Sequence, residues 1–370
     1  MKFEPSFFIK NRKVLLSRSK AKLIVIPAHT AMQRNADAGF LFRQDSNFWY
    51  LAGINEPDYT LVISKEETYL IAPKLTNYQL VMESQTSRES LKSTSGIQHV
   101  LSAKDGWAKL QKQLTQQTKM GVISPPDTRY YALSPNPARS QLLKRLRRYA
   151  PAKNLIDIRN ELTSMRVIKQ SPEVEAIQEA IDITIQTTKE VFAGDWADKF
   201  KYEYEVEAAI SYGFRKRGAS GHAFAPIVIS GSKTASIHNY SSNDQLKQGQ
   251  LIQIDIGAEV SNYAADISRV FPIGNKLSQR QMEIIVAVKD VQKFALTLIK
   301  PGALVRDNEK LIEEYMGKTL KKLGLISAQT KEAIRARYPH SCSHMLGLDV
   351  HDAADYSLPL SENRKHGYYS

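Results

Sequence analysis

The stretch LIQIDIGAEVSNYAADISRVF (251–271) decides how the second half of the chain folds. Ile252, Ile254 and Ile256 occupy every second position near its start. This alternation predicts a half-buried strand whose isoleucines face a core. Asp255, which stands between two of them, is therefore expected on the opposite face of the strand.

A second strand is expected to fold back on the first. Residues 260–263 (VSNY) offer a turn, and residues 264–271 follow as the second strand. In a hairpin centred at 260–261, Asp255 falls opposite Asp266, and opposed residues project from one face with Cβ atoms about 5 Å apart. Two carboxylates this close repel each other, and a divalent cation would relieve the repulsion. Surface aspartates are common, so the pair alone does not decide between a metal site and a solvated face.

Histidines cluster further along the chain. His340, His344 and His351 fall within YPHSCSHMLGLDVHD (338–352), although the whole chain has only eight histidines. Imidazole is the usual nitrogen ligand of metal ions and the usual proton carrier near neutral pH. A further histidine, His238, precedes the strand pair. Each of these side chains could instead pack or hydrogen-bond, and the residues alone leave both interpretations open.

The charge balance raises the question of an anionic partner. The chain has 51 lysine and arginine residues against 38 aspartate and glutamate residues, a net charge of +13. The densest basic cluster is interspersed with leucines, which predicts an amphipathic helix with one solvated face. It comprises Lys144, Arg145, Arg147 and Arg148. No RNA- or DNA-binding motif accompanies it, so no nucleic-acid partner is expected.

Other function classes are excluded by what the sequence lacks. A single cysteine, Cys342, rules out an internal disulfide and fits a reducing compartment, so we expect a cytoplasmic protein. The first residues, MKFEPSFFIKNRK (1–13), lack the apolar block of a secretory signal. No apolar run is long enough to span a membrane, and no membrane association is expected. Zincin-helix, Cys-x-x-Cys, P-loop and nucleophile-elbow motifs are absent as well.

Residues 1–165 are expected to form an α/β domain. The runs at 23–28 and 120–124 predict strands, and the run at 60–73 predicts a hairpin that turns near Glu66 and Glu67. The basic segment described above supplies a helix. Strands that alternate with helices are typical of α/β architecture.

A second domain of α+β type is expected from residue 166 onward. Ser171 as the N-cap, Pro172 at the first helical position and Glu173 in the first turn predict the start of a helix. We expect this helix to turn an apolar stripe toward a core. The stripe comprises Val174, Ile177, Ile181 and Ile185.

Two more helices are expected after a strand-rich block at 223–273. Ser278 and Gln281 form a capping-box pattern at the start of one, which should stop before Pro301. The other lies within 306–322. The second half of the chain is therefore predicted to be a mixed sheet covered by helices.

Three segments of this half resemble aminopeptidase P (Xaa-Pro aminopeptidase), a family of pita-bread metallopeptidases. They are Asp-Ile-Gly (255–257), YAADISRVFP (263–272) and SHMLGLDVHD (343–352). FRQDSNFWYLAGINEPD (42–58) is similar to the N-terminal domain of that family, and RVIKQSPE (166–173) to its domain boundary. The resemblance covers nearly the whole chain in order.

The resemblance implies an N-terminal domain over residues 1–165 and a pita-bread catalytic domain over residues 166–370. It also implies a site for two Mn²⁺ ions. By motif, Asp255, Asp266 and His344 would be metal ligands.

The resemblance further implies the reaction and the partners. His238 and His351 would bind the substrate and stabilise the tetrahedral intermediate, and His340 would be another active-site histidine. The substrate would be a peptide with proline at its second position, attacked by a hydroxide that paired ions make available near pH 7. Family members commonly associate through the N-terminal domain, so a homo-oligomer is expected.

One departure from the family pattern concerns the remaining ligands. The resemblance implies two glutamate ligands in later strands, but Glu362 is the only glutamate after His344 and stands in a polar context. Both ligands are therefore expected to be missing, and the chain is expected to be truncated at its C-terminus. The first glutamate is also the general base of the family, and general acid–base groups are worth roughly 10²–10⁴ in rate. We expect weak Mn²⁺ binding and little or no peptidase activity.

Two other assignments are compatible with parts of this pattern. A non-catalytic pita-bread protein that binds protein or nucleic acid would suit the basic charge, but all the named site residues should then have drifted, and all are present. A creatinase- or prolidase-like hydrolase would share the metal site. The stretch at 42–58 favours aminopeptidase P over that second assignment.

Overall fold

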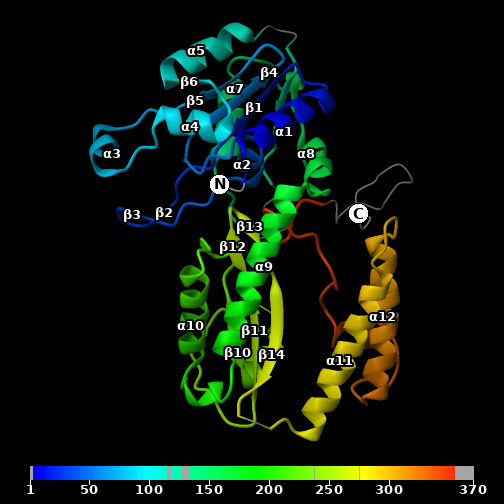
Figure 1. Cartoon of the computed structure of the whole chain (residues 1–370). Coiled ribbons are helices and arrows are strands. Elements are labelled where there is room, and N and C mark those ends of the chain that lie inside the picture. The colour runs from blue at the N-terminus through cyan, green and yellow to red at the C-terminus, as the bar shows by residue number, and fades with distance from the viewer. Residues whose placement is uncertain (1–2, 115–117, 127–132, 237, 275, 355–370) are drawn as a thin grey trace. The chain divides into compact units, whose positions relative to one another are not determined.

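The chain divides into two compact units, Met1–Met165 and Arg166–Ser370, and each has a hydrophobic core of its own (Figure 1). The computed structural model describes residues 3–114, 118–126, 133–236, 238–274 and 276–354. Glu362, the glutamate singled out above, lies outside the described residues.

The first unit is built on a six-stranded sheet in the order β6-β5-β4-β1-β7-β8. β4 runs antiparallel to both neighbours, and the other five strands share one direction. The strands are β1 Leu23–Pro27, β4 Thr60–Ser64, β5 Thr68–Ile71, β6 His99–Leu101, β7 Met120–Val122 and β8 Leu155–Asp157. The strands and the hairpin predicted from the apolar runs are confirmed.

Helices cover this sheet and a short hairpin extends from it. Leu110 of α5 and Leu142 and Leu146 of α7 share one buried cluster with the sheet residues Val25 and Val62. The helices are α1 Pro5–Arg18, α2 Ser46–Ala52, α3 Asn77–Met82, α4 Arg88–Ser95, α5 Ala103–Gln113, α7 Ala138–Leu146 and α8 Arg159–Arg166. The hairpin consists of β2 Gln33–Asn35 and β3 Ala38–Gly39. This unit is α/β, as predicted.

The basic cluster on α7 is solvated only in part. Lys144, Arg147 and Arg148 are exposed, as predicted. Arg145 is instead half-buried, and its guanidinium carbon lies 3.6 Å from the centroid of the Trp107 ring on α5. The prediction of a uniformly solvated face is wrong at Arg145, because a planar guanidinium gains contact energy on an aromatic face.

The second unit contains two small antiparallel sheets. β11 is the central strand of the first, in the order β10-β11-β14, and β12 is the central strand of the second, in the order β13-β12-β9. The strands are β9 Gly221–His222, β10 Ile227–Ser230, β11 Leu251–Ile256, β12 Ala258–Val260, β13 Tyr263–Ala264 and β14 Ile267–Pro272. Together they lie within the predicted strand-rich block, apart from the first two residues, which precede it.

Two helices pack against the β10-β11-β14 sheet and bury the isoleucines of β11. Ala180 and Ile183 of α9 and Phe214 of α10 share one core cluster with Ile252 and Ile254. In Figure 1, α9 crosses this sheet and α10 lies beside it. Their bounds are α9 Ser171–Val191 and α10 Glu203–Lys216. The alternating burial of β11 confirms the predicted half-buried strand.

The buried face of α9 differs from the predicted apolar stripe. The helix begins at Ser171, but its N-cap is Gln170, which forms a capping box with Glu173. Val174 is 52% exposed and Ile185 36% exposed, so the prediction that they face the core is wrong. The buried positions are mostly small or polar, namely Glu173, Ala176, Ala180, Ile183, Thr184, Thr187 and Val191.

Close approach of neighbouring elements explains this choice of face. Gly213 of α10 lies so near α9 that a Cβ there would be 2.4 Å from the Thr187 Cγ2 atom. The Thr184 hydroxyl of α9 accepts a hydrogen bond of 2.9 Å from the Ala258 amide of β12. Small side chains permit such close contacts between elements, and large aliphatic side chains prevent them. The spacing of apolar residues in the sequence does not show where such contacts occur.

Two long helices follow the sheets. Ser278 caps α11 and forms the predicted capping box with Gln281. The helices are α11 Gln279–Leu298, α12 Val305–Lys322 and the short α13 Lys331–Arg335. Among the described residues, no helix combines the length and the apolar character needed to cross a bilayer.

A half-buried histidine makes the second unit sensitive to acid. The His222 Nε2 atom of β9 lies 2.8 Å from the Ser211 hydroxyl of α10. Its Nδ1 atom is buried and has no hydrogen-bond partner within the described part of the chain. Burial lowers the pKa of His222 to about 4. The imidazole is therefore neutral in the folded protein and gains its proton readily only when the unit unfolds.

We expect the stability of the second unit to fall between pH 6.5 and about 4. The unfolded state binds the proton below pH 6.5, whereas the folded state resists it, so acid favours unfolding. Between pH 7 and pH 5 the free energy of unfolding should drop by roughly 2 kcal/mol from this group. Urea unfolding at both pH values measures the drop, and His222→Gln should reduce it. An equal drop in the variant would assign the acid sensitivity to other groups.

Candidate metal centre

The hairpin that carries the two aspartates turns at Ser261 and Asn262. Both residues have positive φ angles, 50° and 66°, as a two-residue type I′ turn requires. β12 and β13 pair across this turn, and β11 and β14 continue the same register further out. The turn therefore lies one residue later than the predicted centre at 260–261.

This shift changes the partner of Asp255. Its residue directly opposite is Ser268, and the prediction that Asp266 stands there is wrong. The Ser268 hydroxyl donates a hydrogen bond of 2.7 Å to Asp255 Oδ1. Asp266 lies between β13 and β14, two residues before Ser268, and still reaches Asp255 from that position.

Gly257 creates the bend that brings Asp266 into reach. A Cβ atom on this residue would lie 1.7 Å from the Ala265 carbonyl oxygen and 3.2 Å from the Asp266 amide nitrogen. The Ala265 amide donates a hydrogen bond of 3.0 Å to the Ala258 carbonyl on the facing strand. Only glycine leaves room for this approach of two backbones.

The carboxyl groups of Asp255 and Asp266 contact each other. Burial is the main cause that raises the pKa of Asp255, and the charge and the hydrogen bond of Asp266 raise it further. The Ser268 hydroxyl acts in the opposite direction. Two carboxylates that share a half-buried site repel each other, and a cation between them would relieve this repulsion.

His344 joins this pair through Asp266. Its Nε2 atom lies 3.2 Å from Asp266 Oδ2, and this hydrogen bond is the main cause that raises the pKa of His344. The Nδ1 atom lies 3.0 Å from the Met345 carbonyl oxygen. The His351 ring packs edge-on against the His344 ring, with centroids 4.3 Å apart. Burial and the neighbouring His344 lower the pKa of His351.

His238 and His340 lie near this group without entering it. Both are exposed, and their charges help to lower the pKa of His351, so they are within electrostatic reach of that ring. His340 Nδ1 lies 2.9 Å from the Ser341 carbonyl oxygen, and the His238 ring stacks at 6.4 Å from that of Tyr240.

A buried ion-pair network, which the sequence analysis missed, anchors the loop that carries His344 and His351. The guanidinium of Arg166 contacts both Asp349 and Asp352, at 2.8 Å in the case of Asp349. Lys169 Nζ lies 2.8 Å from Asp352 Oδ2. Arg166 and Asp352 are only 3% and 2% exposed. Their presence in the two motif segments at 166–173 and 343–352 was the available signal.

Backbone contacts complete the anchoring of this loop. The Ala264 amide of β13 donates a hydrogen bond of 2.8 Å to the Gly347 carbonyl, and the Asp352 amide donates one of 2.9 Å to the Met345 carbonyl. A Cβ atom on Gly347 would lie 2.3 Å from Asp352 Oδ2. The loop is therefore fixed to the strand pair at one point and to residues 166–169 at another.

Glu173 connects the start of α9 to the same strand pair. Its side chain is 1% exposed and accepts a hydrogen bond of 3.0 Å from the Tyr263 hydroxyl of β13. It also accepts one of 2.9 Å from the Gln170 amide. Burial is the main cause that raises the pKa of Glu173. The helix, the strand pair and the loop thus hold one another in place.

The chemistry of this donor set suits a divalent cation. Two carboxylates and an imidazole suit Mn, Fe, Co or Zn, and a cation would relieve the repulsion between Asp255 and Asp266. However, no three His, Cys, Asp or Glu side chains converge closely enough to hold a metal ion in the part of the chain that the structure describes. The Nε2 atom of His344 instead contacts Asp266. The residues therefore fit part of a metal site. For a metal ion to bind there, the contact between His344 and Asp266 must first open.

Comparisons with known proteins find the same two-part organisation. Residues 175–367 match the family model described as metallopeptidase family M24, and residues 8–123 match the one described as aminopeptidase P, N-terminal domain. An Xaa-Pro aminopeptidase of Haemophilus influenzae is 30% identical over 342 residues, which cover 88% of this chain and 75% of that protein.

Solved structures agree with the sequence comparisons. Aminopeptidase P from Escherichia coli in a low-pH form aligns with a TM-score of 0.81 and 25% identity, over 96% of this chain and 83% of that one. The zinc-substituted Escherichia coli enzyme in complex with product aligns with a TM-score of 0.79 and 26% identity, over the same shares of both chains. The predicted fold, an N-terminal α/β domain followed by a pita-bread domain, is confirmed.

Proposed function

Because this chain belongs to the metallopeptidase family M24 and carries the N-terminal domain of aminopeptidase P, we propose that it acts on peptides with proline at the second position and releases the residue before it. The observation that carries this proposal is the contact of Asp255, Asp266 and His344 at the bend of the strand pair. The 30% identical relative is an Xaa-Pro aminopeptidase, which supports the same substrate class.

We propose that Asp255, Asp266 and His344 hold a divalent cation, with Mn²⁺ as the expected ion and two ions in the complete site. The zinc-substituted relative supports the use of divalent metals in this fold. When bound, such ions lower the pKa of a water molecule toward 7 and polarise the scissile carbonyl group.

The protein side chains would orient and stabilise the reacting groups. Ser268 fixes Asp255 through its hydrogen bond, and Asp266 orients the ring of His344. His351 packs against His344, and we assign to it the hydrogen bond to the developing oxyanion. We assign His238 and His340, which lie at the exposed side of this group, to the binding of the substrate.

The activity of this chain is expected to be low. Asp266 contacts both Asp255 and His344, but among the described residues no three such side chains converge closely enough to hold a metal ion. General acid–base groups contribute roughly 10²–10⁴ in rate, and none is assigned here beyond the named histidines. We therefore propose weak Mn²⁺ binding and slow turnover.

Hydrolysis assays with added Mn²⁺ test the proposal. We expect slow release of the first residue from an Xaa-Pro dipeptide and none from the matched Xaa-Ala dipeptide. Mn²⁺ should also raise the midpoint of thermal unfolding, because a ligand of the folded state stabilises it. Asp266→Asn should abolish both effects, whereas Asp290→Asn on the exposed surface of α11 should change neither.

Three results would contradict the proposal. Rates typical of enzymes would contradict the expected weakness of the site. Equal cleavage of both dipeptides would contradict the specificity. The absence of turnover together with no effect of Mn²⁺ on stability would favour the alternative, a non-catalytic protein that binds protein or nucleic acid.

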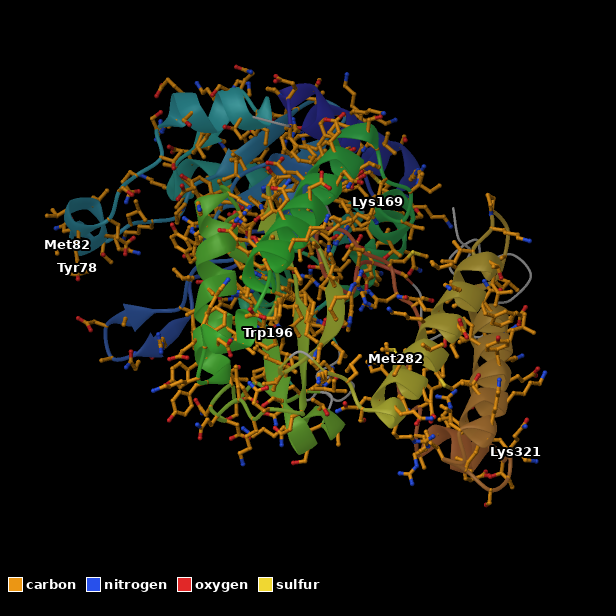
Figure 2. All side chains as sticks on the ribbon, turned by 60° about the horizontal axis from the view of Figure 1, so that its bottom comes forward. Tyr78, Met82, Lys169, Trp196, Met282 and Lys321 are labelled. Atoms are coloured by element: carbon orange, nitrogen blue, oxygen red, sulfur yellow. The ribbon has the colours of Figure 1, made fainter. Side chains whose placement is uncertain are left out.

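The same resemblance supports proposals about organisation. We assign residues 1–165 to the N-terminal domain and 166–370 to the catalytic domain, with a cytoplasmic location that fits the single cysteine. We also propose that the chain forms a homo-oligomer through its first unit. Leu41 and Val81 there are 99% and 81% exposed. Figure 2 shows Tyr78 and Met82 of the neighbouring stretch on α3, which extends away from the rest of that unit.

Light scattering coupled to size-exclusion chromatography measures the oligomeric state. We expect a mass that is a multiple of 41.7 kDa for the chain and a smaller multiple for Leu41→Ser combined with Val81→Ser. These exposed apolar side chains gain contact energy only when a partner covers them. A monomer at all concentrations would refute the proposal.

A further inference from the structure

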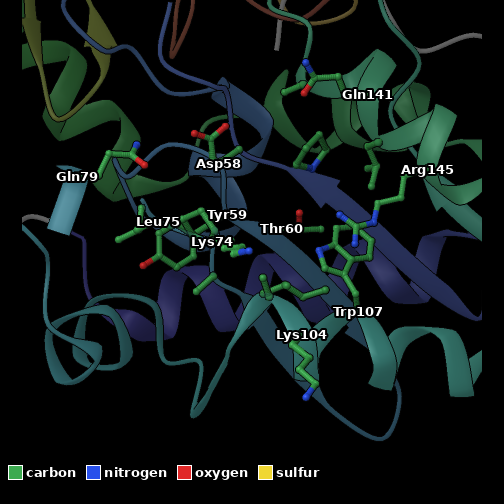
Figure 3. Close-up of a pocket in the computed structure, with 18 residues that line it drawn as sticks. Asp58, Tyr59, Thr60, Lys74, Leu75, Gln79, Lys104, Trp107, Gln141 and Arg145 are labelled. Carbon is green, nitrogen blue, oxygen red and sulfur yellow. The ribbon is translucent and has the colours of Figure 1, made fainter. Parts of the chain in front are cut away.

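A cavity of about 930 Å³ opens in the first unit, at one edge of its six-stranded sheet. Pro27 ends β1, Ile71 ends β5, and Thr60 begins the antiparallel β4, so the three residues lie at the same edge and all line the cavity. α/β sheets place their ligands at the carboxyl ends of parallel strands, and the volume lies within the range of small-molecule sites. Figure 3 shows the cavity and its lining.

Positive side chains outnumber negative ones in the lining. Lys74, Lys104 and Arg145 line the cavity, and Asp58 is the only acidic residue among those that do. Within the described ranges, none of the three cations forms an ion pair with a carboxylate. Three cations around one cavity without such partners point to an anion as the missing counterpart.

The side chain of Arg145 is held in place by a neighbouring aromatic ring. Its guanidinium carbon lies 3.6 Å from the centroid of the Trp107 ring, and both residues line the cavity. In Figure 3 the guanidinium lies across the indole ring. Stacking fixes the orientation of the guanidinium group. Its N–H groups remain available to a ligand, because the face of an aromatic ring does not accept their hydrogen bonds.

The first turn of α5 contributes backbone donors. Ala103 and Lys104 are the first two residues of this 11-residue helix, and both line the cavity. Amide groups in the first turn of a helix have no partner within the helix and carry partial positive charge. They add to the three side-chain cations at the same place.

Much of the remaining lining is apolar and indicates the body of the ligand. It is formed by short or branched side chains at the sheet edge and on the helices, namely Pro27, Ala28, Ile71, Pro73, Leu75 and Leu142. A simple inorganic ion would leave this surface in contact with water. An organic molecule with an acidic head group would cover it and meet the cations as well.

We propose that this cavity binds a small organic anion, with a phosphate or carboxylate group held by Lys104, Arg145 and the first amides of α5. The site lies wholly within the first unit and does not depend on the proposed peptidase reaction. Tyr59, Gln79 and Gln141, which also line the cavity, supply polar contacts for the rest of the molecule.

Calorimetric titration with matched probe pairs tests this proposal and separates the two head groups. Adenosine 5′-monophosphate and benzoate are the anionic probes, and adenosine and benzamide are their uncharged counterparts. We expect saturable binding of at least one anionic probe and at least tenfold weaker binding of its counterpart. Inorganic phosphate should bind more weakly than the phosphate ester, because it leaves the apolar lining uncovered.

Three matched arginine and lysine variants provide the decisive control. Arg145→Gln and Lys104→Gln should each weaken binding by tenfold or more. Arg147→Gln, an exposed residue of the same basic cluster that does not line the cavity, should leave it unchanged. Trp107 fluorescence should respond to the ligand, and circular dichroism checks that each variant is folded. No saturable binding of any anionic probe, or equal losses in all three variants, would overturn the proposal.

Discussion

Asp352→Ala is expected to lower the free energy of unfolding of the second unit by about 3–5 kcal/mol, the range for loss of one partner from a buried ion pair. Asp352 has a side chain that is 1% exposed and accepts contacts from both Arg166 and Lys169. Without it, the buried guanidinium of Arg166 loses its buried counter-charge. Urea unfolding followed by tryptophan fluorescence measures the change.

Two further variants show that the effect comes from the buried charge. Asp349→Ala removes the other carboxylate from Arg166, but its side chain is 49% exposed, so about 0–1 kcal/mol is expected. Asp352→Ala combined with Arg166→Met should regain part of the loss, because no charge is then left buried without its partner. Equal effects of the two aspartate variants would show that burial does not set the energy of this network.

The same variant should loosen the loop of His344 and His351. Hydrogen exchange of the Asp352 amide, which donates to the Met345 carbonyl, reports on this loop directly. Faster exchange in Asp352→Ala than in Asp349→Ala is the expected result. Unchanged protection would mean that the contact between Ala264 and Gly347 alone holds the loop.

Gly257→Ala is expected to destabilise the second unit by about 1–3 kcal/mol or more and to displace Asp266. The added Cβ atom would lie 1.7 Å from the Ala265 carbonyl oxygen, a distance that only movement of the backbone can relieve. The residue that moves next is Asp266. The variant should therefore lose the stabilisation by Mn²⁺ that we expect of the unaltered chain.

Gly249→Ala separates stability from the geometry of the site. Gly249 has a φ angle of 83° and nothing within 4 Å of an added Cβ, so alanine there suffers backbone strain of about 1–2 kcal/mol without a clash. We expect it to lose stability but to keep the response of its unfolding temperature to Mn²⁺. A Gly257→Ala variant that keeps this response would contradict the role assigned to the bend.

Local patterns in the sequence predicted the elements but not the pairing between them. The alternation of Ile252, Ile254 and Ile256 gave β11 and the outward direction of Asp255 correctly. The turn was placed one residue too early, because the true turn residues, Ser261 and Asn262, lack the glycine that usually marks a type I′ turn. One residue at the turn moves the partner of a strand residue by two, from Asp266 to Ser268.

Long-range contacts left no periodic signal to interpret. The face of α9 was predicted from its large aliphatic residues, whereas the close approach of Gly213 and Ala258 selected the face with alanine and threonine. Arg166 and Asp352 likewise stand in separate motifs, and nothing in either motif shows that they meet. The resemblance supplied the candidate ligands that spacing alone left open.

The link between Arg166 and Asp352 has a consequence for the order of folding. The two residues are 186 positions apart, so their contact closes a loop that spans half the chain. Each doubling of loop length raises the entropic free energy of closure by only about 0.6 kcal/mol. The contact can therefore form in the folded state, but it belongs among the slow, non-local steps of folding. On the ribosome, the strand pair with Asp255 and Asp266 emerges well before His344. The site therefore remains incomplete until the loop that carries His344 has been synthesised. A metal ion that binds earlier would find only the oxygen ligands of the two aspartates.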